Sequence, residues 1–124
     1  MLFSDLHITA VNRSGREVPG ADVSLALSDD TSEWSEADFI VLIMPLTEET
    51  IGLVDAAKLK AMKKSAILIN VGRGKLVNTD DLVEALRTGE IAGAGLEVVD
   101  PEPLPDDHPL WGMKIGRASC RERV

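Results

Sequence analysis

The residue best suited to chemistry is Arg73, which stands between two glycines directly after an apolar run. The run reads Ile67-Leu68-Ile69-Asn70-Val71, and Gly72 and Gly74 flank the arginine. Glycine allows a tight turn and a close approach of the backbone to a ligand. A planar guanidinium binds a carboxylate through two parallel hydrogen bonds and can polarise a neighbouring carbonyl. A surface arginine in a glycine-rich turn is the alternative, but the preceding apolar run and Asn70 favour an anion-binding role.

A second candidate is Glu102, which lies among prolines in Asp100-Pro101-Glu102-Pro103-Leu104-Pro105. Three prolines predict a rigid, extended loop. A carboxylate on such a loop can orient a catalytic imidazole and stabilise it when it is protonated. A solvated acidic loop is the alternative.

A third candidate group is Asn12-Arg13-Ser14, which follows a short apolar stretch at residues 7–11. In a dinucleotide-binding fold, an acidic residue here would accept hydrogen bonds from the adenosine ribose, whereas an arginine near a hydroxyl suits a 2′-phosphate. The three residues include no acid, so they favour NADP over NAD. A solvated loop arginine is again the alternative.

These residues need a scaffold, and the chain shows alternating strand and helix patterns. Continuous apolar stretches at residues 7–11, 39–44, 66–69 and 92–99 predict strands that are covered on both faces. Residues 15–36 contain no long periodic run. Asp55 is expected to cap a helix that reaches Met62. Thr79 is expected to cap a second helix, which has two acids in its first turn, a buried stripe at Leu82, Val83 and Leu86, and an exit at Gly89.

Strands that alternate with helices indicate a parallel α/β sheet. Ligands of open parallel sheets bind beyond the carboxyl ends of the strands. Residues 12–14, 44–47, 70–74 and 99–103 each follow a predicted strand, and together they hold the candidate residues. We therefore expect one functional edge.

Composition excludes several classes of protein. The chain has 124 residues, enough for one domain, and its net charge of −8 argues against a nucleic-acid partner. No window approaches the roughly 18 apolar residues that span a membrane, and residues 1–5 do not resemble a signal peptide, so a cytoplasmic protein is expected. Neither His7 nor His108 has a second ligand at metal-binding spacing, so no metal site is expected.

The motifs together resemble those of the D-isomer-specific 2-hydroxyacid dehydrogenase family. The arginine signature is matched throughout Met62-Lys63-Lys64-Ser65-Ala66-Ile67-Leu68-Ile69-Asn70-Val71-Gly72-Arg73-Gly74-Lys75-Leu76-Val77. Residues 37–50 are similar to an earlier cofactor-side signature, and residues 94–98, 101–105 and 108–111 continue the likeness over about residues 5–114. The resemblance implies part of a doubly wound, Rossmann-like NAD(P)-binding domain, closest in character to glyoxylate/hydroxypyruvate reductases.

The resemblance also implies roles for single residues. Arg73 would bind the carboxylate and carbonyl oxygen of a small 2-keto or 2-hydroxy acid, and Glu102 would pair with a catalytic histidine. Hydride would pass between the nicotinamide of NAD or NADP and C2 of the substrate, in a homodimer. The expected cofactor-binding residues are Asn12, Arg13, Ser14, Met44, Pro45, Leu46, Thr50, Val71, Gly72, Arg73 and Glu97. Glu97 stands where the family has a shorter Asp.

The chain departs from the family pattern in other places. A glycine-rich phosphate loop should precede His7, a substrate domain should be present, and a Thr-Pro-His should follow Lys114; none occurs in this sequence. His108 matches a different family position. We therefore expect a partial NAD(P)-binding domain at residues 1–114, truncated at both ends and inactive alone. Residues 115–124 resemble a translated sequencing adapter and are expected to be a non-native tail.

Two alternatives to an enzyme use the same fold. One is an NAD(H)-sensing, corepressor-type binding module, and the other is a non-catalytic interaction protein.

Overall fold

The computed structural model describes residues 6–27, 33–100, 107–109 and 115–116. They belong to two compact units, one within residues 1–33 and one within residues 34–124. Each unit is described by itself.

The first unit contains two parallel strands, β1 (Thr9–Asn12) and β2 (Val23–Ala26). Their register pairs Thr9 with Val23 and Asn12 with Ala26. The apolar stretch at residues 7–11 correctly predicted β1. The sequence did not predict β2, because four residues inside a polar segment are too short to show a period.

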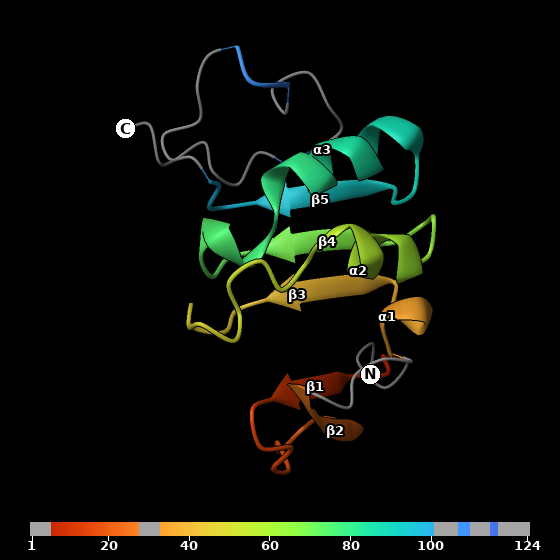
Figure 1. The fold of residues 1–124 in the computed structure, drawn as a ribbon. Helices are drawn as coiled ribbons and strands as arrows, with labels where there is room; N and C mark the ends of the chain where they lie inside the picture. Colours follow the sequence, from red (N-terminus) through yellow and green to blue (C-terminus); the bar gives the residue numbers. More distant parts are fainter. Residues whose placement is uncertain (1–5, 28–32, 101–106, 110–114, 117–124) are drawn as a thin grey trace. The chain divides into compact units, whose positions relative to one another are not determined.

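The second unit is built on a parallel sheet in the order β3-β4-β5-β6, with helices between its strands (Figure 1). This arrangement confirms the predicted parallel α/β fold. The strands are β3 (Phe39–Leu42), β4 (Ile67–Asn70), β5 (Gly93–Leu96) and β6 (Ile115–Gly116); the helices are α1 (Glu33–Glu36), α2 (Ala56–Ala61), the 3-10 turn η3 (Gly74–Leu76) and α3 (Thr79–Thr88). Two strands are shorter than predicted: β3 ends before Ile43, and β5 ends before Glu97.

Local capping sets the helix ends. The Asp55 side chain accepts a hydrogen bond from the backbone N–H of Lys58 at 3.1 Å, as predicted for the start of α2. The prediction that Thr79 caps α3 is wrong. Asn78 is the cap, and its Oδ1 accepts from the N–H of Asp81 at 3.1 Å. Both residue types favour this position, so the sequence did not distinguish two neighbours. Gly89 ends α3 in the left-handed region, as expected.

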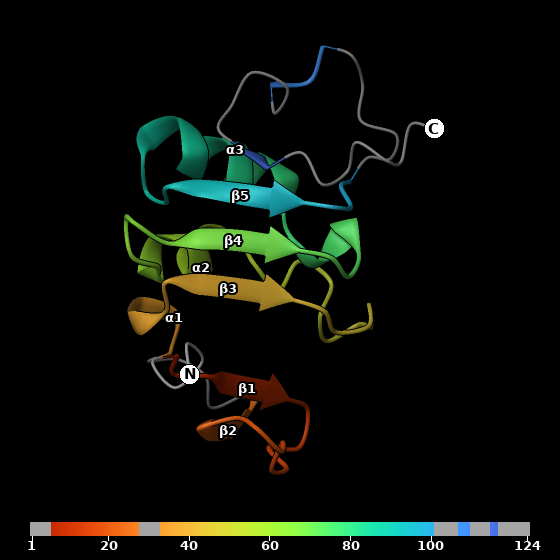
Figure 2. The same cartoon turned by 180° about the vertical axis from the view of Figure 1, so that it is seen from behind.

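Figures 1 and 2 show α2 and α3 on the same face of β3, β4 and β5. Buried side chains of the strands and helices form the core under these helices, among them Leu42, Leu59, Leu68, Leu82 and Leu96. Of the predicted α3 stripe, Leu82 is buried, whereas Val83 and Leu86 are partly buried against this core.

The opposite face of β3 is exposed. Phe39 is 62% exposed and Val41 is 51% exposed, so the expectation of cover on both faces is wrong for the part of the chain described. An apolar run identifies side chains that favour burial, but not the segment that covers them. None of the helices among the described residues is long and apolar enough to cross a membrane.

Candidate active site at the carboxyl edge of the sheet

The loops after β3, β4 and β5 meet at one edge of the second unit. The N–H of Val71 donates to the carbonyl of Leu42 at 3.1 Å, and the N–H of Glu97 donates to the carbonyl of Asn70 at 3.0 Å. Backbone pairing therefore continues past the strand ends, and it joins the loops that carry most of the predicted cofactor residues.

Thr50 shapes the loop after β3. It is 7% exposed; its hydroxyl donates to the carbonyl of Pro45 at 2.9 Å and accepts from the N–H of Thr47 at 2.7 Å. Met44 and Leu46 pack partly against the core, which leaves Pro45 exposed at the rim. In this structure the Thr50 hydroxyl is bonded within its own loop. The predicted contact between Thr50 and the cofactor stays a prediction.

Asn70, at the end of β4, holds the loop that carries Arg73. Its side chain is 1% exposed. Oδ1 accepts from the N–H of Gly72 at 3.1 Å, and Nδ2 donates to the carbonyl of Arg73 at 2.9 Å. The N–H of Leu76 donates to the same carbonyl at 3.1 Å, so the backbone at Arg73 is fixed from both sides.

The guanidinium of Arg73 extends from this fixed backbone at an exposed position. Nη1 donates to the carbonyl of Gly72 at 3.3 Å, which is a long hydrogen bond. This arrangement suits an anion-binding arginine, because the backbone is already held and only the side chain has to be ordered on binding.

The two glycines beside Arg73 allow close packing. A Cβ on Gly72 would lie 3.1 Å from the carbonyl oxygen of Met44, in the loop after β3. A Cβ on Gly74 would overlap the backbone of Val99 and lie 2.8 Å from the nitrogen of Asp100. The Arg73 loop is thus packed directly against the segment that leads to Glu102. Glu102 itself lies outside the described residues.

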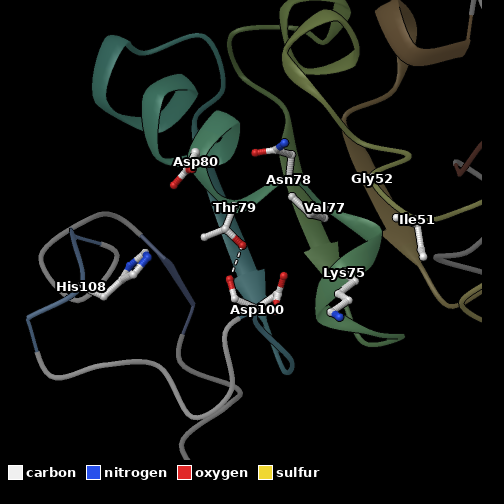
Figure 3. Close-up of a pocket in the computed structure, with 9 residues that line it drawn as sticks. All are labelled: Ile51, Gly52, Lys75, Val77, Asn78, Thr79, Asp80, Asp100 and His108. Carbon is white, nitrogen blue, oxygen red and sulfur yellow. Dashed lines mark hydrogen bonds between the residues drawn. The ribbon is translucent and has the colours of Figure 1, made fainter.

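A pocket of about 400 Å³ opens beside the start of α3 (Figure 3). Its described lining residues are Ile51, Gly52, Lys75, Val77, Asn78, Thr79, Asp80, Asp100 and His108. None of the predicted cofactor or substrate residues is in this lining. Within the described ranges, no three His, Cys, Asp or Glu side chains are grouped as they would be around a metal ion.

The loop predicted to contact the 2′-phosphate of NADP, residues 12–14, belongs to the first unit. The side chain of Asn12 closes this loop, because Oδ1 accepts from the N–H of Gly15 at 2.6 Å and from that of Arg16 at 3.1 Å. Arg13, Ser14 and Arg16 are exposed. Two arginines and a hydroxyl on one short loop suit a phosphate group. Arg16, three residues after Arg13, was not among the residues predicted from the sequence.

Residues 3–115 match the family model described as D-isomer specific 2-hydroxyacid dehydrogenase, NAD binding domain. The chain belongs to the D-isomer specific 2-hydroxyacid dehydrogenase family. The family predicted from the arginine signature is therefore confirmed, and so is the Rossmann-like α/β fold.

Three similar proteins illustrate this dehydrogenase relationship. The glyoxylate reductase of Pyrococcus horikoshii is 59% identical over 94 residues, covering 71% of this chain and 28% of that protein. A solved family member of Aeromonas salmonicida has a TM-score of 0.84 and 42% identity, covering 91% of this chain and 37% of that one. A family member of Xanthobacter autotrophicus, solved in complex with NADPH, has a TM-score of 0.80 and 32% identity, covering 89% and 47%. The chain spans less than half the length of each.

Exposed apolar side chains lie at the same edge of the dehydrogenase domain as the predicted cofactor residues. Ile43 is 72% exposed and Val71 is 43% exposed, directly after β3 and β4. Gly72 brings the backbone of one loop close to the other. Exposed apolar side chains beside a close-packed backbone suit a flat ring, with Pro45 and the half-buried Glu97 at the same edge.

The sequence did not predict that Asn70 holds the Arg73 loop. Asn70 was considered only as a neighbour of Arg73. A usable signal was present, because a polar residue at the end of an apolar strand must find buried partners.

Proposed function

We propose that this domain serves an NAD(P)-dependent oxidoreductase that acts on a small 2-keto acid, with glyoxylate or hydroxypyruvate as substrate. The observation that carries the proposal is the fixed backbone of Arg73 with its exposed guanidinium. The glyoxylate reductase name of a relative that is 59% identical over the shared segment supports the substrate class.

In this mechanism Arg73 binds the substrate carboxylate through two hydrogen bonds and donates to the carbonyl oxygen as negative charge develops there. The bound cofactor supplies or accepts the hydride at C2. Glu102 orients a catalytic histidine and stabilises its protonated form. The loops at Pro45, Val71 and Gly72 hold the nicotinamide end.

NADP is the proposed cofactor. Arg13 and Ser14 would contact the 2′-phosphate, with Arg16 as a second cation, while Asn12 keeps the loop closed. A relative solved with NADPH supports this preference. The complete enzyme is proposed to be a cytoplasmic homodimer.

A chimera tests the proposal. Residues 6–109 of this chain would replace the corresponding segment of the Pyrococcus horikoshii glyoxylate reductase. We expect the chimera to reduce glyoxylate, faster with NADPH than with NADH, and Arg13→Ala to remove that preference. We expect Arg73→Lys to lower kcat/KM by about 100-fold or more, because lysine cannot form the planar two-bond contact.

Arg87→Lys is the matched control, since Arg87 pairs with Glu84 on the surface of α3. It should leave kcat/KM within about twofold of the parent. Equal effects of the two substitutions would show that Arg73 does not bind the substrate. A chimera that binds NADPH but turns over no 2-keto acid would instead favour a cofactor-sensing binding module.

A further inference from the structure

We propose that Thr79 is a positioning residue, which holds Asp100, two residues before Glu102, against the start of α3. The inference rests on the proposed function, because it concerns how the two expected active-site residues keep their spacing. They are far apart in the sequence, so their spacing depends on contacts between two loops.

The first contact is between backbones. Gly74 lies so close to Val99 and Asp100 that no side chain could stand between the two segments. Close packing of this kind fixes how near the loops are, but it does not prevent one from sliding past the other. A directional bond is needed for that.

The second contact is a hydrogen bond, which restrains how the two segments are oriented. The hydroxyl of Thr79 donates to the carbonyl of Asp100, 21 residues further along the chain (Figure 3). Thr79 is the first residue of α3, one position after the cap. Asn78 is that cap. The Thr79 hydroxyl is therefore used only to join two segments.

The two sides of this junction have separate supports. The Arg73 side is held by Asn70 and by the N–H of Leu76. Removing the Thr79 hydroxyl would leave those bonds in place and release only the Asp100 side. Asp100 is two residues before Glu102, and the prolines on either side of Glu102 restrict the backbone dihedral angles there. We therefore expect the loss of the Thr79 hydrogen bond to change the catalytic effect proposed for Glu102.

This separation predicts a specific kinetic effect. In the proposed mechanism Arg73 binds the substrate carboxylate already in the ground state, whereas Glu102 acts through the histidine only when the proton moves. In the chimera, Thr79→Val should lower kcat by about tenfold and leave KM for glyoxylate within about twofold. Thr79→Ser, which restores the hydroxyl, should return kcat to within about twofold of the parent.

Thr88→Val is the matched control. Thr88 ends the same helix, and its hydroxyl also donates to a backbone carbonyl, that of Glu84 at 2.9 Å. The substitution removes the same chemical group without touching either loop, so kcat should not change.

A measurement on the 124-residue chain tests the junction without any activity. In Thr79→Val, the backbone order parameter of the Asp100 amide, measured by NMR relaxation, should fall from about 0.85 towards 0.6. Thr79→Ser and Thr88→Val should leave it unchanged. If Thr79→Val does not fold, Thr79→Ala removes the hydroxyl without inserting a methyl group in its place.

An unchanged Asp100 order parameter in Thr79→Val, or a Thr79→Ser variant that behaves like Thr79→Val, would overturn the proposal. So would a lower order parameter with unchanged kcat. If the parent chimera does not reduce glyoxylate, the proposed function fails, while the order parameter still decides whether Thr79 holds Asp100.

Discussion

Asn70 shows how one buried amide prepares a site before any ligand binds. Each end of its side chain is used, one as an acceptor for Gly72 and the other as a donor to Arg73. Because the side chain is 1% exposed, water cannot replace a lost partner. The backbone of the substrate-binding loop is therefore set by a residue that need not touch the substrate.

Asn70→Asp tests this role with almost no change in size. The carboxylate can still accept from the N–H of Gly72. It cannot donate to the carbonyl of Arg73, so two oxygen atoms would face each other at short range. We expect a loss of about 1–3 kcal/mol in the free energy of unfolding of the chain. In the chimera, we expect KM for glyoxylate to rise about tenfold. Urea unfolding and steady-state kinetics measure the two effects.

Asn78→Asp is the control for that substitution. Asn78 caps α3 at an exposed position, and Asp caps a helix as well as Asn does. Its stability and kinetics should match those of the parent. If both variants gave the same small effect, Asn70 would not be the support of the Arg73 loop.

At the scale of elements, the sheet of the second unit has one covered and one open face. The helices α2 and α3 pack on the covered face (Figure 2). On the open face, Phe39 and Val41 are exposed. The strands β3 and β4 pair in register from Phe39↔Ile67 to Leu42↔Asn70. Successive side chains of a strand point to opposite faces of the sheet. The same strand can therefore tolerate polar residues at some positions and not at others.

Val→Thr substitutions test this difference, because they keep the side-chain shape and the preference for strands. Val41→Thr should change the free energy of unfolding by less than about 0.5 kcal/mol, since Val41 is 51% exposed. Val54→Thr, at an isolated β-bridge outside β3, should cost about 1–3 kcal/mol, since Val54 is 0% exposed and a hydroxyl there lacks water. Thermal or urea unfolding of the chain measures both. Equal losses would mean that the β3 face is covered in solution.

At the scale of the whole molecule, the chain forms two compact units and carries only part of the expected catalytic set. Arg73 and Glu102 are present, but the only histidines are His7 and His108. His7 belongs to the first unit, and His108 lines a pocket whose described lining does not include Arg73. In the part of the chain that the structure describes, this pocket therefore does not bring His108 and Arg73 together.

We therefore expect the isolated 124-residue chain to show no NADPH-dependent reduction of glyoxylate, whereas the chimera does. A missing general acid alone costs about 10²–10⁴-fold in rate. The measurement is the loss of NADPH absorbance with purified chain at high concentration. Turnover that disappears in Arg73→Lys would contradict the expectation, and would mean that this chain supplies its own proton donor.

The sequence by itself determined the features that depend on neighbouring residues. Apolar runs located β1, β3 and β4, and cap chemistry located the start of α2 and the end of α3. The arginine signature identified the family. Each of these signals is contained within a few residues, and a hydrophobic period or a cap acts over one or two turns of chain.

Only the tertiary structure decided which distant residues meet. β2 exists because β1 pairs with it, and the sheet face of Phe39 is open because no helix among the described residues covers it. The choice of Asn78 over Thr79 as the cap left a hydroxyl for Asp100, across 21 residues. Contacts of this kind depend on how separate elements pack, and no local pattern of residue types specifies that packing.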